Sequence, residues 1–407
     1  MHSPLERRCA DLARVRGHRD GRVRLRRVTF PLFDVVPACA GRVSRVELGN
    51  FPTPVESLEP VARELGVAGS GAWVKRDDIS SPAYGGNKVR TLELLFGQAK
   101  ALGHAQVFST GAFGSNHALA TAIHAPRVGL EPGALLFPQP ISLAAFANLR
   151  ALAGSGARLV SLPHWSVLPF GMTWLRLASE PRPYVMVPGG ATPLGALGYV
   201  SAALELGRQI AAGELPVPRR VIVGVGSTCT SAGLLLGFAL AAHVRLGFEP
   251  ASLPWLTSVR VSPWPITSRL RILGLATRAA RLLHALSAGQ VPLFDSRTLG
   301  ARFEIDGRFL GPGYGEPSLP GDEAEALWRR LGLPLLDGTY SAKAAARVVA
   351  GLRAREPGPV LFWSTKSSVP MPTPDATPTK ENRDASIPPR IRAWLLRAER
   401  TLPPASP

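Results

Sequence analysis

The stretch VIVGVGSTCTSAGLLLG, Val221–Gly237, indicates how this chain of 407 residues folds. Its first residues are apolar and β-branched, which is typical of a strand buried on both faces of a sheet. A turn of glycine, serine and threonine follows, and the apolar run after the turn is long enough to form a helix. A buried strand that leads into a helix in this way is typical of a parallel α/β sheet.

The same alternation of strand and helix continues on both sides of this stretch. The strand-like segments are AQVFSTG, GALLFPQ, ARLVSLP and YVMVPGG before it, and VRVSPWPI and PVLFWST after it. Helical patterns such as LGYVSAALELGRQIAAG and AKAAARVVAGLRAR separate them. We therefore predict an α/β fold with parallel sheets covered on both faces, in which ligands bind at the carboxyl ends of the strands.

Composition excludes several classes of protein. Apolar residues make up 45% and charged residues 19% of the chain, as in ordinary soluble globular proteins. There is no apolar run of membrane-spanning length and no signal-peptide core near the N-terminus, so we expect a cytoplasmic protein. The three cysteines lack the spacing of metal ligands or of a disulfide framework, and we expect no metal site.

The net charge of +18 raises the question of nucleic-acid binding. Residues 1–45 hold eleven arginines and four acidic residues, whereas the charge of the middle of the chain is diluted over a large surface without a basic stripe. The first segment can contact an anionic polymer or surface, or it can be a solvated tail. We favour the solvated tail and expect neither a nucleic-acid partner nor a membrane.

The turn after the strand at 221–225 is a candidate phosphate site. Gly226, Ser227, Thr228 and Thr230 offer N–H and hydroxyl donors at the start of a helix. Two glycines also match the dinucleotide fingerprint, but Cys229 stands where its third glycine belongs. A plain loop remains the other alternative.

The stretch SPAYGGNKVRTLELL, Ser81–Leu95, places Lys88 behind two glycines and an asparagine at the start of a helical pattern. Gly85 and Gly86 permit positive φ and a close approach of the backbone. A partly desolvated lysine loses its proton more readily, which a lysine that reacts with an aldehyde requires. The alternative is an ordinary lysine at a helix start. For Asp77 and Asp78, just before this loop, we expect turn and ion-pair roles.

Two further groups of residues follow predicted strands. In STGAFGSNHALATA, Ser115, Asn116 and His117 begin a helix whose free N–H groups favour an anion, although an ordinary helix cap explains them as well. The segments GPGYGEP, LLDGTYSAK and LFWSTKSS carry polar residues that can stack on a flat ring, move a proton or bond a ring nitrogen, or can be structural. These residues are Tyr314, Tyr340 and Thr365.

Taken together, these motifs resemble one family of enzymes. VKRDDI…GGNKVRTLE, STGAFGSNHA, GGATPLGALGYVSAALEL, VGVGSTCTSAGLLLG, GPGYGEP, LLDGTYSAKA and LFWSTKS follow the order of the D-cysteine desulfhydrase and 1-aminocyclopropane-1-carboxylate deaminase family. The resemblance covers about residues 48–368. It implies a tryptophan-synthase-β-like fold (fold type II of pyridoxal-phosphate enzymes) with two three-layer α/β domains, a pyridoxal 5'-phosphate cofactor and commonly a homodimer.

The resemblance also assigns expected roles around the cofactor. Lys88 would bond covalently to pyridoxal phosphate, and Asn116 would hydrogen-bond the phenolic oxygen. Gly226 to Thr230, with Cys229 among them, would bind the phosphate. Thr365 would lie near the pyridine nitrogen.

On the substrate side, the resemblance implies that Ser115, Asn116 and His117 contact the substrate carboxylate and the reacting face. Tyr314 and Tyr340 match active-site tyrosines of the family. Ser115 and the tyrosines are also expected to be catalytic, together with the lysine. Ser341 is also expected to contact the substrate, and it occupies the position of a glutamate in the deaminases and of a threonine in the desulfhydrases. A carboxylate there would favour a protonated pyridinium, so serine favours β-elimination over cyclopropane ring opening.

The chain departs from the family's pattern at three places, one in the expected phosphate loop and two beside the expected substrate. Thr228 and Cys229 replace glycine in the phosphate loop, ALATAIHA after SNH lacks polar and basic residues, and Lys366 with two serines replaces glycines after WST. The predicted function is therefore a pyridoxal-phosphate-dependent lyase or deaminase, with β-elimination from D-cysteine or a similar amino acid preferred. The alternatives are a 1-aminocyclopropane-1-carboxylate deaminase and an inactive cofactor-binding homologue that acts through its basic tail or a partner.

The expected domain organisation follows from the same reasoning. We expect a basic tail over residues 1–42, a larger cofactor-binding domain formed by 43–84 and 200–369, and a smaller inserted domain at 85–199. Residues 370–407 read as a Pro-rich, largely disordered tail with one short amphipathic helix in IRAWLLRAERTL.

Overall fold

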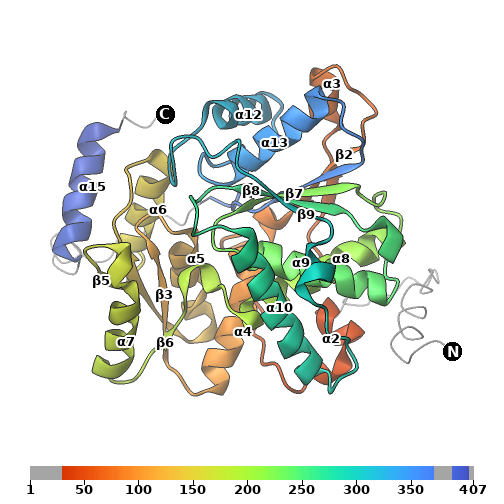
Figure 1. The fold of residues 1–407 in the computed structure, drawn as a ribbon. Coiled ribbons are helices and arrows are strands. Elements are labelled where there is room, and N and C mark those ends of the chain that lie inside the picture. The colour runs from red at the N-terminus through yellow and green to blue at the C-terminus, as the bar shows by residue number, and fades with distance from the viewer. Residues whose placement is uncertain (1–29, 371–386, 403–407) are drawn as a thin grey trace, which may run out of the picture.

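The computed structural model describes residues 30–370 and 387–402. Two sheets organise this part of the chain, and both are built mainly from parallel strands (Figure 1). The expected α/β fold is confirmed.

The larger sheet has six strands in the order β1-β2-β10-β7-β8-β9. They are β1 (Val55–Ser57), β2 (Ala72–Arg76), β7 (Arg220–Val225), β8 (Trp255–Arg260), β9 (Phe303–Asp306) and β10 (Val360–Ser364). All neighbours are parallel except the edge pair β1 and β2, which is antiparallel. Leu361 of β10 lies opposite Trp73 on one side and Val221 on the other, so strands from both ends of the chain meet at the centre.

Helices cover both faces of this sheet (Figure 1). On one face lie α8 (Pro193–Ala211), α9 (Cys229–His243), α10 (Arg269–Leu286), α11 (Ser296–Gly300) and α2 (Pro31–Val35). On the other lie α12 (Leu319–Arg330), α13 (Ser341–Arg353) and α3 (Glu59–Glu64). Each face has its own cluster of buried apolar side chains, which gives three layers.

The smaller sheet has four parallel strands in the order β5-β4-β3-β6. They are β3 (Gln106–Ala112), β4 (Glu131–Phe137), β5 (Arg158–Ser161) and β6 (Tyr184–Val185). One face is covered by α4 (Lys88–Ala101), α5 (Asn116–His124) and α6 (Leu143–Ala153), and the other by α7 (Leu168–Ala178). These elements fall within the range 85–199 that the sequence places in an inserted domain.

Single turns of 3-10 helix connect several of these elements. They are η1 (Pro37–Cys39), η2 (Asp77–Ile79), η3 (Pro126–Val128), η4 (Trp165–Val167), η5 (Pro188–Gly190) and η6 (Pro250–Ser252). Of these, η2 and η5 border the candidate site.

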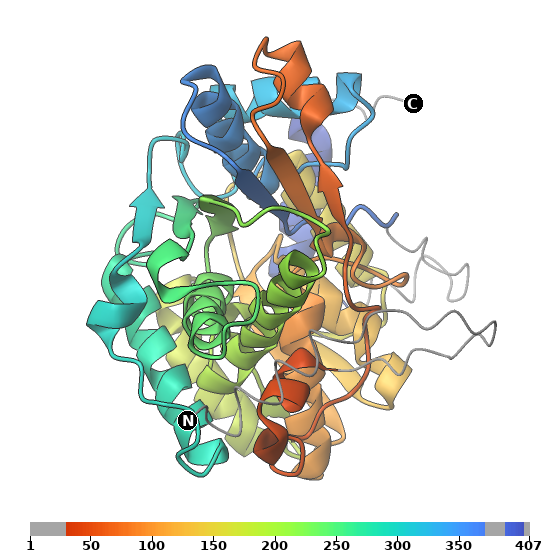
Figure 2. The same ribbon diagram turned by 90° about the vertical axis from the view of Figure 1, so that its right-hand side faces the viewer.

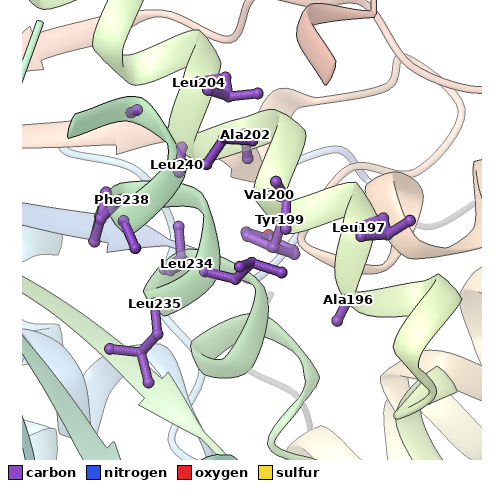
Figure 3. Packing of buried hydrophobic residues seen from close by; sticks show 14 of the residues in the cluster. Ala196, Leu197, Tyr199, Val200, Ala202, Leu204, Leu234, Leu235, Phe238 and Leu240 are labelled. Carbon is purple, nitrogen blue, oxygen red and sulfur yellow. The ribbon is translucent and has the colours of Figure 1, made fainter. Parts of the chain in front are cut away.

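Helices α8 and α9 pack against each other along their length (Figure 3). A Cβ at Gly233 would overlap the carbonyl oxygen of Ala196 and the side chain of Tyr199, and one at Gly237 would lie 2.5 Å from the Cβ of Ala203. Only glycine allows the two backbones to approach this closely, and the contact fixes where the N-terminus of α9 lies.

The ends of the described chain differ from the expected tails in one respect. Residues 30–42 were placed in a basic tail, but Phe30, Leu32 and Val35 are buried in the core of the larger sheet. The Leu32 N–H also donates to the Ser201 hydroxyl of α8 at 3.2 Å. The apolar run FPLFDVV explains the difference, because its hydrophobic side chains gain more by packing against α8 than by remaining in solvent. Residues 1–29 of the expected basic tail, and residues 371–386 and 403–407 of the expected Pro-rich tail, lie outside the described residues.

The short amphipathic helix expected near the C-terminus is present as α15 (Pro389–Thr401). It packs on the smaller unit beside α6, far from the larger sheet (Figures 1 and 2). Ile391 is buried there, and the Trp394 indole N–H donates to the Gln139 carbonyl at 2.9 Å. Within residues 30–370 and 387–402, no helix is both long and apolar enough to cross a membrane.

Candidate active site

The candidate site lies where elements of the two sheets meet. Lys88 begins α4 and lies beside the loops after β3, β7 and β10. The Asn87 N–H donates to the Thr365 carbonyl at 3.1 Å, and the Asn87 side chain donates to the Thr230 hydroxyl at 3.1 Å. The lysine loop is therefore joined to the loops after β10 and β7, as expected for ligand sites at the carboxyl ends of strands.

Gly85 and Gly86 are required by the packing of the lysine loop. A Cβ at Gly85 would overlap the Asp78 carbonyl of η2, and one at Gly86 would lie 2.7 Å from the Thr365 carbonyl. Gly86 also has a φ of +95°, in the region that favours glycine. The backbone of the loop is thus pressed against protein backbone, and this contact sets the position of Lys88.

Lys88 is half-buried and has two titratable neighbours, His117 and Cys229. Burial lowers the pKa of the Lys88 ammonium. Burial, and then the charge of Lys88, lower the pKa of His117 to about 3, so this imidazole is neutral at physiological pH. Neither ring nitrogen of His117 has a hydrogen-bond partner among the described residues, although the side chain is 2% exposed. Such buried polar atoms are rare without a ligand or water to bond them.

The loop after β7 forms a turn suited to an anion. Thr228 has a φ of +72°, in the left-handed region, and stands at the N-cap of α9. The first N–H groups of α9 have no partner within the helix, and a left-handed residue before them curves the backbone into a concave donor surface. The loop after β6 closes over this turn, because Gly189 has a φ of +65° and its missing Cβ leaves room for the Ser227 side chain.

Cys229, which the sequence places in the phosphate loop, is buried against the protein and hydrogen-bonded to its backbone. Its thiol donates to the Gly190 carbonyl at 3.4 Å, and the side chain is buried. Burial raises the pKa of Cys229 to about 11, so the thiol stays protonated. A buried, protonated thiol is a poor nucleophile.

The N-terminus of α5 presents Asn116 to the site. Its Oδ1 accepts from Asn148 Nδ2 at 2.8 Å and lies 3.4 Å from both the Tyr84 hydroxyl and Lys366 Nζ. Its amide NH₂ donates to no side chain or carbonyl in the described ranges and is available to a ligand oxygen. The Ser115 hydroxyl, by contrast, accepts the Ala118 N–H at 3.2 Å as the helix cap.

Tyr314 and Tyr340 form a pair whose hydroxyl oxygens are 3.1 Å apart. Their rings meet edge to face with centroids 6.2 Å apart, and burial raises the pKa of both hydroxyls. Tyr340 packs on the loop after β7, since a Cβ at Gly226 would lie 3.0 Å from its hydroxyl. The structure thus brings these two expected residues to the same place.

Ser341 follows Tyr340 at the start of α13. Its hydroxyl donates to Asp337 Oδ1 at 2.8 Å, and its N–H donates to the same oxygen at 2.8 Å. Its expected contact with substrate stays a prediction, as do the individual roles of the other site residues.

Sequence reasoning missed Tyr84 and Asn148 and treated Lys366 only as a departure from the family. Tyr84 stands four residues before Lys88 in the same loop, which is the signal that could have found it. Asn148 lies in the middle of α6 without a motif around it, and only the fold brings it to Asn116.

The comparisons with known proteins establish the class. Residues 46–281 match the family described as pyridoxal-phosphate dependent enzyme, and the chain belongs to this family. It is 36% identical to nocardicin C-9' epimerase of Nocardia uniformis subsp. tsuyamanensis over 81% of this chain and 94% of that protein. It is 32% identical to D-cysteine desulfhydrase of Salmonella choleraesuis over 80% of this chain and 94% of that protein. The resemblance seen in the sequence is therefore confirmed.

Two solved structures confirm the fold. A homologue of ACC deaminase has a TM-score of 0.65 at 24% identity and covers 88% of this chain and 99% of that chain. O-ureido-L-serine synthase has a TM-score of 0.52 at 16% identity and covers 83% of this chain and 97% of that chain.

The residues present fit pyridoxal phosphate. The unbonded nitrogens of His117 and the free NH₂ of Asn116 call for a polar ligand between the sheets. Lys88, with its lowered pKa, is suited to bond the aldehyde, and the turn at the N-terminus of α9 is suited to the phosphate. The expected cofactor is confirmed by the family.

Proposed function

We propose that this enzyme eliminates the β-substituent of D-cysteine or of a similar β-substituted amino acid. D-cysteine and water would give pyruvate, ammonia and hydrogen sulfide. The observation that carries the proposal is the match to D-cysteine desulfhydrase, which extends over 94% of that protein at 32% identity. The arrangement around Lys88 supports it.

Lys88 is proposed to remove the Cα proton of the substrate at Nζ. When bound, pyridoxal phosphate supplies the electron sink for the charge left at Cα. Burial lowers the pKa of the Lys88 amine, which brings a general base closer to its working pH. His117 beside it stays neutral, so it adds no charge that would oppose protonation of Lys88.

The tyrosine pair is proposed to protonate the leaving sulfur. Burial raises the pKa of Tyr314 and of Tyr340, so both hydroxyls carry a proton at neutral pH. The 3.1 Å contact between them lets one hydroxyl stabilise the other while a proton is given up.

The surroundings expected for the pyridine nitrogen carry hydroxyl groups. Thr365 follows β10, and Ser341 stands where a deaminase has glutamate. The nearby carboxylate of Asp337 accepts from Ser341 and from the Tyr340 N–H. A hydroxyl at the nitrogen would leave the ring neutral and weaken the sink, which favours loss of a good leaving group over ring opening.

The test is to supply the purified full-length protein with pyridoxal phosphate and then with D-cysteine or 1-aminocyclopropane-1-carboxylate. Keto acid and sulfide are both measured. We expect pyruvate and sulfide in equal amounts from D-cysteine. If only the cyclopropane acid reacts and gives 2-oxobutanoate, the proposed elimination is wrong. Keto acid from neither would favour the inactive homologue.

The 36% identity to nocardicin C-9' epimerase favours a second candidate, inversion at Cα without loss of the β-substituent. This reaction also starts with removal of the Cα proton, for which Lys88 is placed. Incubation of either enantiomer of an amino acid in D₂O distinguishes the two. Exchange of the Cα proton for deuterium, together with inversion of the configuration at Cα and no release of keto acid, would support epimerisation.

We further propose that the protein works as a homodimer, as the family resemblance implies, and that it is cytoplasmic. Light scattering during size-exclusion chromatography tests the oligomeric state. A mass of one chain across the micromolar range would contradict the dimer.

A further inference from the structure

Lys366 is the first residue after Thr365 at the end of β10, and its ammonium group enters the candidate site. Its Nζ lies 3.3 Å from the Tyr84 hydroxyl and 3.4 Å from Asn116 Oδ1. The Nζ also lies 5.6 Å from the centre of the Tyr84 ring. We propose that Lys366 binds the α-carboxylate of the substrate.

The charge of Lys366 has no matching carboxylate. Its hydrogen-bond partners are the hydroxyl of Tyr84 and the amide oxygen of Asn116, and within the described ranges no carboxylate oxygen lies within 4.0 Å of its Nζ. Burial by itself lowers the pKa of Lys366, but Tyr84 and Asp337 outweigh this and hold the pKa above its usual value. A half-buried ammonium without an ion-pair partner is costly unless an anion joins it.

The other cations near the site are already engaged. Lys88 would be bonded to the cofactor. Arg90 is paired with Asp77 and Glu205. Lys343 donates to two backbone carbonyls, at 2.6 and 3.2 Å. Lys366 is therefore the cation that remains for a substrate in this part of the structure.

The backbone that carries Lys366 is held in place by the two serines that follow it. The Ser367 hydroxyl accepts the Gly85 N–H at 3.0 Å. The Ser368 N–H donates to the Asp78 carbonyl at 3.1 Å, and its hydroxyl donates to Asp78 Oδ2 at 2.7 Å. The residues that replace the family's glycines thus fix this loop to the lysine loop and to η2, which reduces the entropy lost when Lys366 binds a ligand.

The N-terminus of α5 completes the proposed carboxylate site. The N–H groups of Asn116 and His117 are in its first turn and have no partner within the helix, while that of Ala118 is taken by Ser115. The unbonded nitrogens of the buried His117 show independently that this end of the helix faces a place for a polar ligand. A carboxylate between these N–H groups and Lys366 would contact positive potential on both sides.

The inference rests on the proposed function, because it takes the ligand to be an amino acid. It deepens that proposal by restricting the substrates to amino acids with a free carboxylate. Esters, amides and residues inside a peptide would lose the contact with Lys366.

The experiment measures binding without turnover. Propionate and propionamide have nearly the same shape, but only propionate is charged. Saturation-transfer NMR titrations of both are recorded with the full-length protein in the presence of pyridoxal phosphate. The proteins are the wild type, Lys366→Met, Lys366→Gln, and the control Lys100→Met, which removes the same charge at the distant end of α4. The visible band of bound cofactor and the thermal midpoint show that each variant is loaded and folded.

We expect propionate to bind the wild type and Lys100→Met at least tenfold more tightly than propionamide, and both Lys366 variants to lose this preference. Equal binding of propionate by Lys366→Gln and the wild type would overturn the inference, as would a wild type without a preference. For any amino acid that is turned over, Lys366→Gln should raise KM more than it lowers kcat. Because the titration involves no reaction, a failure of D-cysteine as substrate leaves the carboxylate result intact.

Discussion

Arg90 and Asp77 form a two-pronged ion pair beneath the lysine loop. Arg90 Nη2 lies 2.7 Å from Oδ1 of Asp77, and Arg90 Nε lies 2.9 Å from Oδ2. Both side chains are buried, and Asp77 also accepts from the Tyr199 hydroxyl and the Trp363 indole at 2.8 Å each. Since Arg90 is two residues after Lys88 in α4, the pair ties the helix of the lysine to the larger sheet.

Loss of this pair should destabilise the protein strongly. We expect Arg90→Met to lower the free energy of unfolding by about 3–5 kcal/mol, because it leaves the buried Asp77 without its main cation. The matched control is Arg329→Met, which removes an exposed ion pair with Glu325 at 2.7 Å and should cost no more than about 0.5 kcal/mol. Urea unfolding of both variants provides the measurement. If the two variants lose similar amounts of unfolding free energy, the buried ion pair stabilises the fold no more than the exposed one.

The same network predicts sensitivity to acid. Glu205 contacts Lys75 at 2.6 Å and Arg90 at 2.9 Å. Burial alone would raise the pKa of Glu205, but Arg90 and Lys75 outweigh it and lower the pKa to about 2 from its ordinary 4.5. A carboxyl with a lower pKa in the folded state stabilises the fold above pH 4.5, and this contribution is lost as the pH falls towards 2.

We therefore expect Glu205 to contribute about 2 kcal/mol less at pH 3 than at pH 6. The measurement is the free energy of unfolding of the wild type and of Glu205→Gln across this range. The difference between the two proteins should shrink as the pH falls. A constant difference would mean that the charge of Glu205 does not stabilise the fold.

Lys88→Ala should abolish the covalent bond to pyridoxal phosphate, because it removes the amine that is placed for the aldehyde. The wild type should show a visible absorption band and, after borohydride reduction, a mass increase on the peptide that contains Lys88. The variant should show neither, and its activity should fall by a factor of at least about 100. Lys100→Met serves as the control. Labelling of another lysine in the wild type would contradict the assignment.

The tyrosine pair should matter more for turnover than for binding. Tyr340→Phe removes the hydroxyl that lies 3.1 Å from Tyr314 and keeps the ring that packs on Gly226. We expect kcat to fall by a factor of about 100 with a small change in KM, because the lost proton transfer occurs only in the transition state. A larger change in KM than in kcat would instead assign the residue to binding.

Thr228 carries a backbone conformation that costs energy for any residue other than glycine. At a φ of +72° the cost is about 1–2 kcal/mol, partly offset by the lower entropy of a threonine in the unfolded chain. We therefore expect the free energy of unfolding of Thr228→Gly to be about 0.5–1 kcal/mol higher than that of Thr228→Ala, because alanine keeps the backbone strain while it also loses the threonine side chain. Denaturant unfolding compares the two. An advantage for alanine would show that the left-handed geometry is not strained.

The sequence by itself determined the fold class and, through its resemblance to a known family, the cofactor. The strand at 221–225 and the turn after it already indicate a parallel sheet with an anion at its edge, because a buried strand, a donor-rich turn and a helix are consecutive in the chain. The lysine after two glycines is likewise a local pattern. The ion-pair role of Asp77 was also expected from its place before the lysine loop, and the structure confirms it.

Only the tertiary structure decided which distant residues share the site. Asn148, in the middle of a helix, contacts Asn116, and Lys366 reaches Tyr84 across 282 positions of sequence. No short motif encodes such contacts, because they depend on how two sheets pack against each other. The protonation of Cys229 and His117 was decided in the same way, since burial sets their pKa values and burial is a property of the folded chain.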